Sequence, residues 1–246
     1  MPATAWIVVP TLCEAANVER MVRALRAAAP ACTRVLIVDD ASPDGTGAIA
    51  DRIAATDEHV SVLHREGARG LGPAYVDGFA HALAGGAGSI VQIDCDLSHD
   101  PAMVPLLLAA LDDGADLALG SRYVPGGRVE NWSGWRRAVS RAGCAYARTV
   151  LRVPVRDLTG GLKCWRAEAL AAIGFADARA RGYAFQIELT HRALVAGLRV
   201  VELPITFRER REGQSKLSGH VALEAAWRVP ALRLQSRRVP ADPRGL

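Results

Sequence analysis

The sequence predicts an α/β fold: a single domain built on a mostly parallel central sheet with helices on both faces. Two observations predict it. Within the first 120 residues, short apolar runs alternate with segments whose apolar residues recur at helical spacing, and the connections are short. Such β-α-β alternation is typical of a parallel sheet covered by helices on both sides. In addition, the chain has 246 residues, 50% of them hydrophobic, which is enough for one substantial core.

The expected elements follow in chain order. Apolar runs predict strands at residues 6–9, 34–38, 60–63, 90–93 and 116–119. Helical spacing predicts helices over residues 18–25, around 49–53, over 73–83 and over 104–111. The first helix ends before Pro30. The fourth is preceded by Asp100 and Pro101, because proline is tolerated at the first position of a helix.

The second half contains a basic segment, residues 135–152, with helical period. One face of this helix carries Trp135, Val139, Ala142, Tyr146 and Val150, and a stripe of Arg137, Arg141, Arg148 and Arg152 lies roughly opposite. Basic amphipathic helices with aromatic residues tend to lie on anionic membrane surfaces, although an ordinary solvated surface helix has the same pattern. A second interfacial helix is expected near 219–234. The domain is thus expected to span 1–235, followed by a disordered tail at 236–246.

Composition and charge exclude several classes of protein. No run approaches the roughly 20 apolar residues of a membrane span, and no leader-like segment precedes the first strand. The five cysteines are scattered without a Cys-x-x-Cys pair, which argues against a zinc site and favours a reducing, cytoplasmic compartment. The net charge of +4 is too small by itself to indicate nucleic-acid binding. Dinucleotide and phosphate-loop glycine motifs are also missing from the sequence.

Two carboxylates close the strand at 90–93. Asp94 and Asp96 stand one residue apart where the strand ends, which is the edge at which open α/β sheets bind ligands. Two acids so close repel each other unless a cation neutralises them, and oxygen ligands suit Mg²⁺ or Mn²⁺. An isolated pair of this kind is also compatible with two solvated loop acids.

Further motifs accompany this pair in a fixed order. They occupy residues 9–14, 38–46, 70–75, 94–99, 120–123, 157–161, 182–188 and 210–216. From about residue 5 to about residue 220, the chain resembles the family-2 glycosyltransferases of GT-A (Rossmann-like) fold and, within them, the polyprenol (dolichyl) phosphate mannose synthases. The chain departs from the family pattern at Leu12 and Cys13, where Tyr-Asn is usual, so the base pocket lacks an aromatic surface.

The resemblance implies a role for each matching residue. The base and ribose pocket would be lined by Pro10, Leu12, Glu14, Val38 and Asp40. The nucleotide sugar would be contacted by Asp94, the Cys95 backbone and Asp96, and Asp96 would hold the metal with Asp94 and Ser98 as further ligands. Arg122 and Arg136 would grip the acceptor phosphate, and Arg210 and Lys216 would close over the donor diphosphate. Asp96, Arg122 and Arg136 are therefore the candidate catalytic residues.

The implied reaction is metal-dependent transfer of mannose from GDP-mannose to a polyprenyl phosphate, with inversion to a β-linked product. The acceptor phosphate is largely ionised at neutral pH, so no general base is expected. The arginine-striped helix, with exposed Trp132 and Trp135, would hold the enzyme at the cytoplasmic face of a membrane without a span. A membrane-anchoring partner protein is left open, and nucleic acid is not an expected partner.

Several alternatives stay open from the sequence. The same motifs are compatible with a polyprenyl-phosphate glucosyltransferase that uses UDP-glucose, or with a non-catalytic subunit that binds a nucleotide sugar. Among single residues, Asp39 is a candidate for bracing its own loop and Lys163 for an ordinary surface charge. Lys163 also stands out because lysine occurs at only two positions, 163 and 216.

Overall fold

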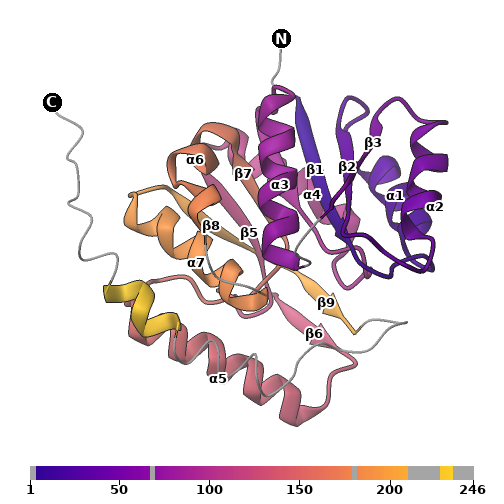
Figure 1. Cartoon of the computed structure of the whole chain (residues 1–246). Coiled ribbons are helices and arrows are strands. Elements are labelled where there is room, and N and C mark those ends of the chain that lie inside the picture. Colours follow the sequence, from indigo (N-terminus) through magenta and orange to yellow (C-terminus); the bar gives the residue numbers. More distant parts are fainter. Residues whose placement is uncertain (1–3, 67–69, 179–181, 210–227, 235–246) are drawn as a thin grey trace, which may run out of the picture.

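The computed structural model describes residues 4–66, 70–178, 182–209 and 228–234. Its centre is a sheet with the strand order β3-β2-β1-β4-β7-β5-β8 (Figure 1). These strands are β1 (Ala5–Thr11), β2 (Arg34–Asp39), β3 (Val60–His64), β4 (Ser89–Gln92), β5 (Leu117–Ser121), β7 (Lys163–Arg166) and β8 (Val200–Pro204). A separate parallel pair is formed by β6 (Arg128–Glu130) and β9 (Thr206–Arg208). All five strands expected from apolar runs are confirmed.

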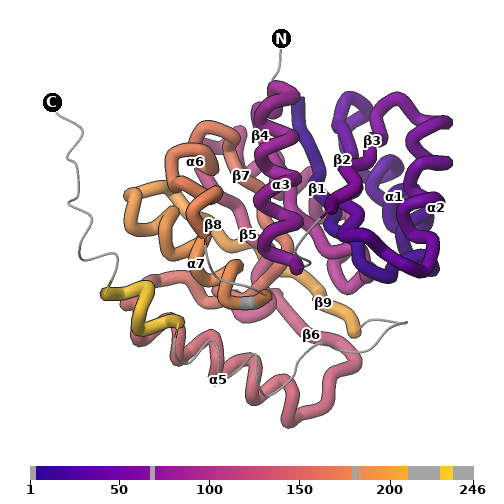
Figure 2. The backbone as a smooth tube through the Cα atoms, in the orientation of Figure 1, coloured from indigo at the N-terminus to yellow at the C-terminus, as the bar shows by residue number. Residues whose placement is uncertain are grey.

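The helices connect these strands and pack on both faces of the sheet (Figures 1 and 2). They are α1 (Val18–Ala28), α2 (Thr46–Ala54), α3 (Leu71–Ala84), α4 (Val104–Asp112), α5 (Gly134–Leu151), α6 (Ala167–Ala172) and α7 (Gly182–Val195). Short 3-10 turns precede α4 and follow α6, at Pro101–Met103 and Phe175–Asp177. Asp100 caps the first of these turns, since its Oδ1 accepts a hydrogen bond from the Ala102 N–H at 3.0 Å. The expected helices of the first half are therefore confirmed.

The sheet is mostly parallel, as expected, but one strand runs against the others. β1 is parallel to both β2 and β4, whereas β7 is antiparallel to both β4 and β5. Between β5 and β7 the chain passes through β6 and α5, and it then enters the sheet in the opposite direction. An apolar run predicts a strand but not its direction, so this feature was not expected.

Two hydrophobic cores fill the space between the sheet and its helices. On one face, Trp6, Val8 and Leu36 pack with α3 and α7 through Tyr75, Phe79 and Phe185. On the other face, Ile7 and Ile37 pack with α1 and α4 through Met21, Leu25 and Leu107. The alternation of side chains along β1 and β2 places successive residues in different cores, as a sheet buried on both faces requires.

Helix α5 lies along one side of the molecule, away from α1 and α2 (Figure 1). Its buried residues are Cys144, Ala147 and Leu151, while Trp135 is 79% exposed. The helical residues 228–234 cover the end of α5, where the Arg233 guanidinium donates to the Val150 carbonyl oxygen. The helix predicted over 135–152 is confirmed. Of the second predicted interfacial helix, residues 219–227 lie outside the described residues, as does the predicted tail at 236–246.

The expectation that Trp132 is exposed is wrong. Its exposed fraction is 6%, because its ring lies 4.2 Å from the Arg136 guanidinium carbon and 5.3 Å from the ring of Phe207. Trp135 remains the exposed tryptophan of this segment. In the part of the chain that the structure describes, no helix has the length and hydrophobicity needed to cross a bilayer.

The contact between α3 and the sheet depends on a glycine, and this leads to a stability prediction. A Cβ atom at Gly78 would lie 2.5 Å from Val8 Cγ1 and 3.0 Å from Val38 Cγ2. Both valines are buried and stiff, so Gly78→Ala should lower the free energy of unfolding by about 1–3 kcal/mol. Urea unfolding measures this change.

Gly143→Ala is the matched control on α5. Nothing lies within 4 Å of a Cβ atom built at Gly143. Alanine favours a helix over glycine by up to about 1 kcal/mol, so this variant should be as stable as the parent or more so. Equal destabilisation of the two variants would contradict the predicted role of close packing at Gly78.

Candidate active site

The candidate site lies where three parallel strands end side by side. β2, β1 and β4 are neighbours in the sheet, and the chain leaves them at Asp39, Thr11 and Gln92. From β1 the chain continues to β2 and β3 on one side of the sheet, and then crosses to β4 on the other side of β1. Such a reversal of strand order opens a crevice at the carboxyl edge of the sheet, which is where α/β proteins bind ligands. The loops that carry the predicted donor-site residues therefore meet at one place.

Left-handed backbone marks the loop that follows each of these three strands. Cys13, Ala41 and Leu97 have φ angles of 59°, 54° and 59°. Each costs about 1–2 kcal/mol for a residue with a Cβ atom, and such strain tends to cluster at functional sites. Side chains hold the loops in place: the Cys13 N–H donates to Ser42 Oγ at 3.1 Å. This clustering supports the same edge of the sheet as the functional site.

The two acids predicted as metal ligands are held from several directions. Tyr75 is fully buried on α3, and its hydroxyl donates to Asp94 Oδ1 at 3.0 Å. Gly161 leaves room on the other side, because a Cβ atom there would lie 2.7 Å from Asp94 Oδ2. Asp96 is 5% exposed, and its Oδ1 accepts from the Ser98 N–H at 3.0 Å. Tyr75 belongs to the motif at residues 70–75, but no contact with Asp94 was predicted for it.

Ser98 supplies an observation that bears on a cation. Its hydroxyl oxygen is buried and has no hydrogen-bond partner within the described residues, and a buried polar atom in that state costs about 1–3 kcal/mol. Two carboxylates and a hydroxyl form an oxygen-only set that fits Mg²⁺ or Mn²⁺. The described residues contain no group of three or more His, Cys, Asp or Glu side chains that could hold a metal. A cation here would therefore need ligands from the substrate, as Mg²⁺ usually does beside phosphates.

The acids after β2 brace the site. Thr11 Oγ1 donates to Asp39 Oδ1 at 3.3 Å, and the Ser42 N–H donates to Asp39 Oδ2 at 3.3 Å, which confirms that Asp39 braces its loop. Asp40 is also engaged, because its Oδ1 pairs with the Arg65 guanidinium and its Oδ2 accepts from the Gly70 N–H at 2.6 Å. Contact of Asp40 with a nucleotide stays a prediction.

The other residues predicted to line the nucleotide pocket differ in burial and in hydrogen bonding. Glu14 accepts a hydrogen bond from Asn17 Nδ2 at 2.8 Å, while its own N–H donates to Thr46 Oγ1 at 2.9 Å. Leu12 is half-buried, and Pro10 is buried. The Val38 side chain is fully buried in the core beside α3, so any contact with a nucleotide must come from its backbone.

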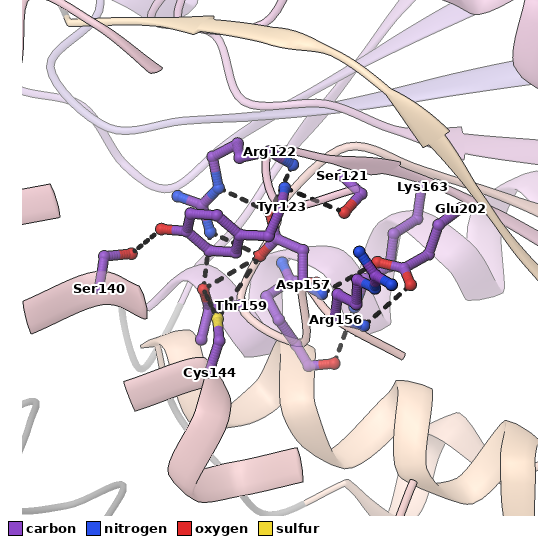
Figure 3. A network of polar contacts seen from close by, with 11 residues as sticks. Ser121, Arg122, Tyr123, Ser140, Cys144, Arg156, Asp157, Thr159, Lys163 and Glu202 are labelled. Atoms are coloured by element: carbon purple, nitrogen blue, oxygen red, sulfur yellow. Dashed lines mark hydrogen bonds and ion pairs between the residues drawn. The ribbon is translucent and has the colours of Figure 1, made fainter. Parts of the chain in front are cut away.

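Arg122, directly after β5, forms a buried ion pair with Asp157 (Figure 3). Asp157 Oδ2 accepts from the Arg122 N–H at 2.9 Å and from Nε at 2.7 Å, while Oδ1 accepts from Nη2 at 2.7 Å. The same Nη2 donates to Thr159 Oγ1 at 2.7 Å. Burial alone would raise the pKa of Asp157, but the charge and hydrogen bonds of Arg122 outweigh burial and lower it.

The structure brings the two predicted acceptor-phosphate residues together around one indole ring. The guanidinium carbons of Arg122 and Arg136 lie 5.8 Å and 4.2 Å from the centroid of Trp132. Arg136 also pairs with Glu209, with 2.5 Å between Nη1 and Oε1. Contact of these arginines with a phosphate stays a prediction. Arg210 and Lys216, predicted to close over the donor, lie outside the described residues.

Lys163 is a buried amine that was not predicted to belong to the site. Its side chain is fully buried on β7, and its Nζ donates to the Gln186 carbonyl oxygen at 2.7 Å. Burial lowers its pKa to about 7, although the charges of Asp157 and Asp94 act in the opposite direction. The expectation of an ordinary surface charge is therefore wrong, and the scarcity of lysine was the one signal that pointed here.

Comparisons with known proteins identify the family of the chain. The family model "Glycosyl transferase family 2" matches residues 6–174. The polyprenol monophosphomannose synthase of Mycolicibacterium smegmatis is 45% identical over 94% of this chain and 87% of its own length. The undecaprenyl-phosphate mannosyltransferase of Micrococcus luteus is 44% identical over 94% of each chain. The dolichol-phosphate mannosyltransferase of Pyrococcus furiosus is 32% identical over 89% of this chain and 60% of its own.

A solved structure of similar fold is glucosyl-3-phosphoglycerate synthase from Mycobacterium tuberculosis in complex with Mn²⁺, uridine diphosphate and glucosyl-3-phosphoglycerate. The TM-score is 0.66 at 21% identity, over 100% of this chain and 84% of that one. This likeness confirms the predicted fold class.

The ion pair between Arg122 and Asp157 makes a testable contribution to stability. Asp157→Asn leaves the arginine buried without its counter-charge, which should lower the free energy of unfolding by about 3–5 kcal/mol at neutral pH. The folded-state pKa of Asp157 lies below its ordinary value of 3.8, so the contribution of this group is fully present above pH 3.8 and is lost as the pH falls through the folded-state value. Denaturant unfolding between pH 7 and pH 3 measures both effects.

Glu19→Gln is the matched control, because it removes one carboxylate from an exposed pair with Arg23 on α1. This variant should change the free energy of unfolding by no more than about 0.5 kcal/mol. If Asp157→Asn resembles this control, the buried pair does not stabilise the fold.

Proposed function

Because the chain belongs to glycosyl transferase family 2, we propose that it transfers mannose from GDP-mannose to a polyprenyl phosphate and inverts the anomeric carbon. The observation that carries the proposal is the pair of acids at the end of β4, fixed by Tyr75 and Gly161 beside the Ser98 hydroxyl. The names of the relatives at 44–45% identity support mannose and a polyprenyl phosphate as the transferred sugar and the acceptor.

The donor side is the crevice between the ends of β2, β1 and β4. Asp94, Asp96 and Ser98 would hold a divalent cation, which supplies positive charge beside the departing diphosphate. Tyr75 restricts Asp94 to one orientation by its hydrogen bond, and the Cys13 N–H joins the loop after β1 to Ser42 in the loop after β2. The site is thus organised before the reaction rather than during it, which is how preorganised charge lowers a barrier.

The acceptor side needs cations but no base. A phosphate monoester is already largely ionised at neutral pH, because its second pKa is about 6. Arg122 is fixed by Asp157 and Thr159, and Arg136 by Trp132 and Glu209, so both guanidinium groups are oriented in advance. Arginine suits this role because its planar fork matches the oxygens of a phosphate.

We place the acceptor at the cytoplasmic face of a membrane, with α5 as the contact. Trp135 and Tyr146 are exposed on this helix, at 79% and 40%, and Arg137, Arg141, Arg148 and Arg152 are exposed as well. An amphipathic helix of this kind binds the interface between headgroups and acyl chains. The long lipid tail would then remain in the bilayer while its phosphate reaches Arg122 and Arg136.

The donor is tested by an extraction assay. Purified protein is incubated with polyprenyl phosphate, Mg²⁺ or Mn²⁺, and either radiolabelled GDP-mannose or radiolabelled UDP-glucose. Label should move from GDP-mannose into the organic phase only when polyprenyl phosphate is present. Preferential transfer from UDP-glucose would replace mannose by glucose in the proposal, and no transfer from either donor would favour a binding subunit.

The role of Asp96 is tested by Asp96→Asn. Asparagine keeps an oxygen to accept from the Ser98 N–H, so the loop should stay folded while the charge that holds a cation is lost. Transfer should fall by at least about 100-fold, as for the loss of one group that stabilises transition-state charge.

Asp100→Asn is the matched control in the same loop. Asp100 also accepts from a backbone N–H two residues further on, at 3.0 Å, and it is exposed outside the acid pair. Its substitution should leave transfer within about twofold of the parent. Comparable activity of the Asp96 and Asp100 variants would remove Asp96 from the proposed site.

A further inference from the structure

A hollow lies between α5 and the segments on either side of it, apart from the donor crevice. Its volume is about 290 Å³, and it is lined by Tyr123, Arg141, Cys144, Ala145, Arg148 and Arg156. Ligand pockets span roughly 300–1,000 Å³, so this one suits a small group rather than a nucleotide. Arg141 and Arg148 stand seven residues apart on α5, about two turns, which places both on one face. Arg156 reaches the same hollow from the segment after the helix.

The hollow is strongly positive because its acidic neighbours are already engaged. Among the described residues, none of its three arginines forms an ion pair with a carboxylate. Asp157 is neutralised by Arg122, and Glu202 accepts from the backbone N–H groups of Arg156 and Asp157 at 2.8 Å and 2.9 Å. Figure 3 shows Asp157 between Arg122 and Arg156, with Glu202 beside Arg156.

The other lining groups add no negative charge. Burial, and next the nearby Asp157, raise the pKa of the Cys144 thiol to about 11, so the sulfur is neutral near pH 7. The Tyr123 hydroxyl donates to Ser140 Oγ at 2.6 Å, and its ring lies 5.7 Å from the Arg141 guanidinium carbon. A cation over an aromatic face is held in a preferred position, so Arg141 is partly oriented before any ligand binds.

We infer that this hollow binds a phosphate group, supplied by the headgroup of an anionic membrane lipid. Three guanidinium groups around a small space match the several oxygens of a phosphate, which arginine recognises through paired N–H donors. The lipid source follows from charge complementarity: the hollow lies on α5, the helix proposed to contact the membrane, and the three arginines that line it complement an anionic headgroup. This site specifies the membrane contact of the proposed function, and it does not depend on which sugar is transferred.

A soluble experiment tests the phosphate chemistry. Inorganic phosphate is titrated at constant ionic strength into isotope-labelled protein, with chloride as the balancing anion, and backbone amide shifts are followed by NMR. Saturable shifts should centre on residues 141–148 and 156, and they should vanish in R141Q/R148Q. Shifts that are absent, or that persist in this variant, would overturn the phosphate site. The result stands whether or not the protein transfers mannose.

A vesicle experiment tests the lipid source with matched variants. R141Q/R148Q removes two arginines that line the hollow, and R137Q/R152Q removes two exposed arginines of the same helix that do not. Binding is measured to phosphatidylcholine vesicles that contain phosphatidylglycerol, and to vesicles of equal surface charge that contain cholesteryl hemisuccinate instead. One basic side chain near an anionic surface is worth roughly a factor of five, and a fitted site should exceed that.

The expected result is a loss of binding to phosphatidylglycerol vesicles that is at least about tenfold larger for R141Q/R148Q than for R137Q/R152Q, with R156Q also impaired. On hemisuccinate vesicles the two double variants should behave alike. Equal losses on phosphatidylglycerol would show a basic stripe without a lipid site and would overturn the lipid source. Phosphate-induced shifts combined with equal vesicle binding would identify a site for free phosphate.

Discussion

The buried ion pair between Arg122 and Asp157 determines how the two halves of the site meet. Two charges in the interior are tolerated only when they neutralise each other and their hydrogen bonds are made, and here Asp157 accepts two bonds from the Arg122 side chain and one from its backbone. This ties the end of β5 to the segment 157–161. The same segment reaches the donor side within a few residues, where Gly161 lies against Asp94. A side chain at that position would collide with the acid, so the pairing of Arg122 with Asp157 and the position of Asp94 depend on one short loop.

The buried amine of Lys163 lies close to the same loop. Lys163 follows Gly161 by two residues, enters β7, and faces the charges of both Asp157 and Asp94 from within the core. Its hydrogen bond to the Gln186 carbonyl joins β7 to α7, and the amide of Gln92 joins β4 to the Gln186 side chain at 2.8 Å. Buried polar contacts therefore join β4, β7 and α7 next to the site. In a medium of low dielectric constant such contacts are specific, because each group is costly to leave without its partner.

The sequence predicted the elements of the first half because local patterns determine them. Helical spacing in α1 and apolar runs in β1 and β2 depend only on neighbouring residues. The family resemblance implied that Leu12, Glu14 and Asp40 line one site with residues 94–98, and these residues follow three neighbouring strands of the sheet. The antiparallel direction of β7 and the burial of Trp132 arise from segments far apart in the chain. The partner of Arg122 lies 35 residues away, and Tyr75 reaches Asp94 from a different helix. No periodicity in a single sequence encodes such pairs, so the contacts of Tyr75, Asp157 and Lys163 emerged only from the structure.

The arginines of this region are either buried and hydrogen-bonded or exposed, and these two environments suit different roles. Arg122 is 4% exposed and bonded on two of its nitrogens, so it has lost its freedom before any substrate arrives and adds fixed positive charge. Arg141, Arg148 and Arg156 are exposed, and in the described part of the chain their side chains are not paired with carboxylates, so their charges act outward on whatever approaches α5. A fixed positive charge can orient a reacting phosphate to within a fraction of an ångström. Exposed positive charges attract an anionic surface at longer range and need no defined orientation. Tyr123 lies between the two sets of arginines. The centroid of its ring is 5.1 Å from the guanidinium carbon of Arg122 and 5.7 Å from that of Arg141. Tyr123 thus links Arg141, which lines the hollow on α5, to Arg122, whose contact with an acceptor phosphate stays a prediction.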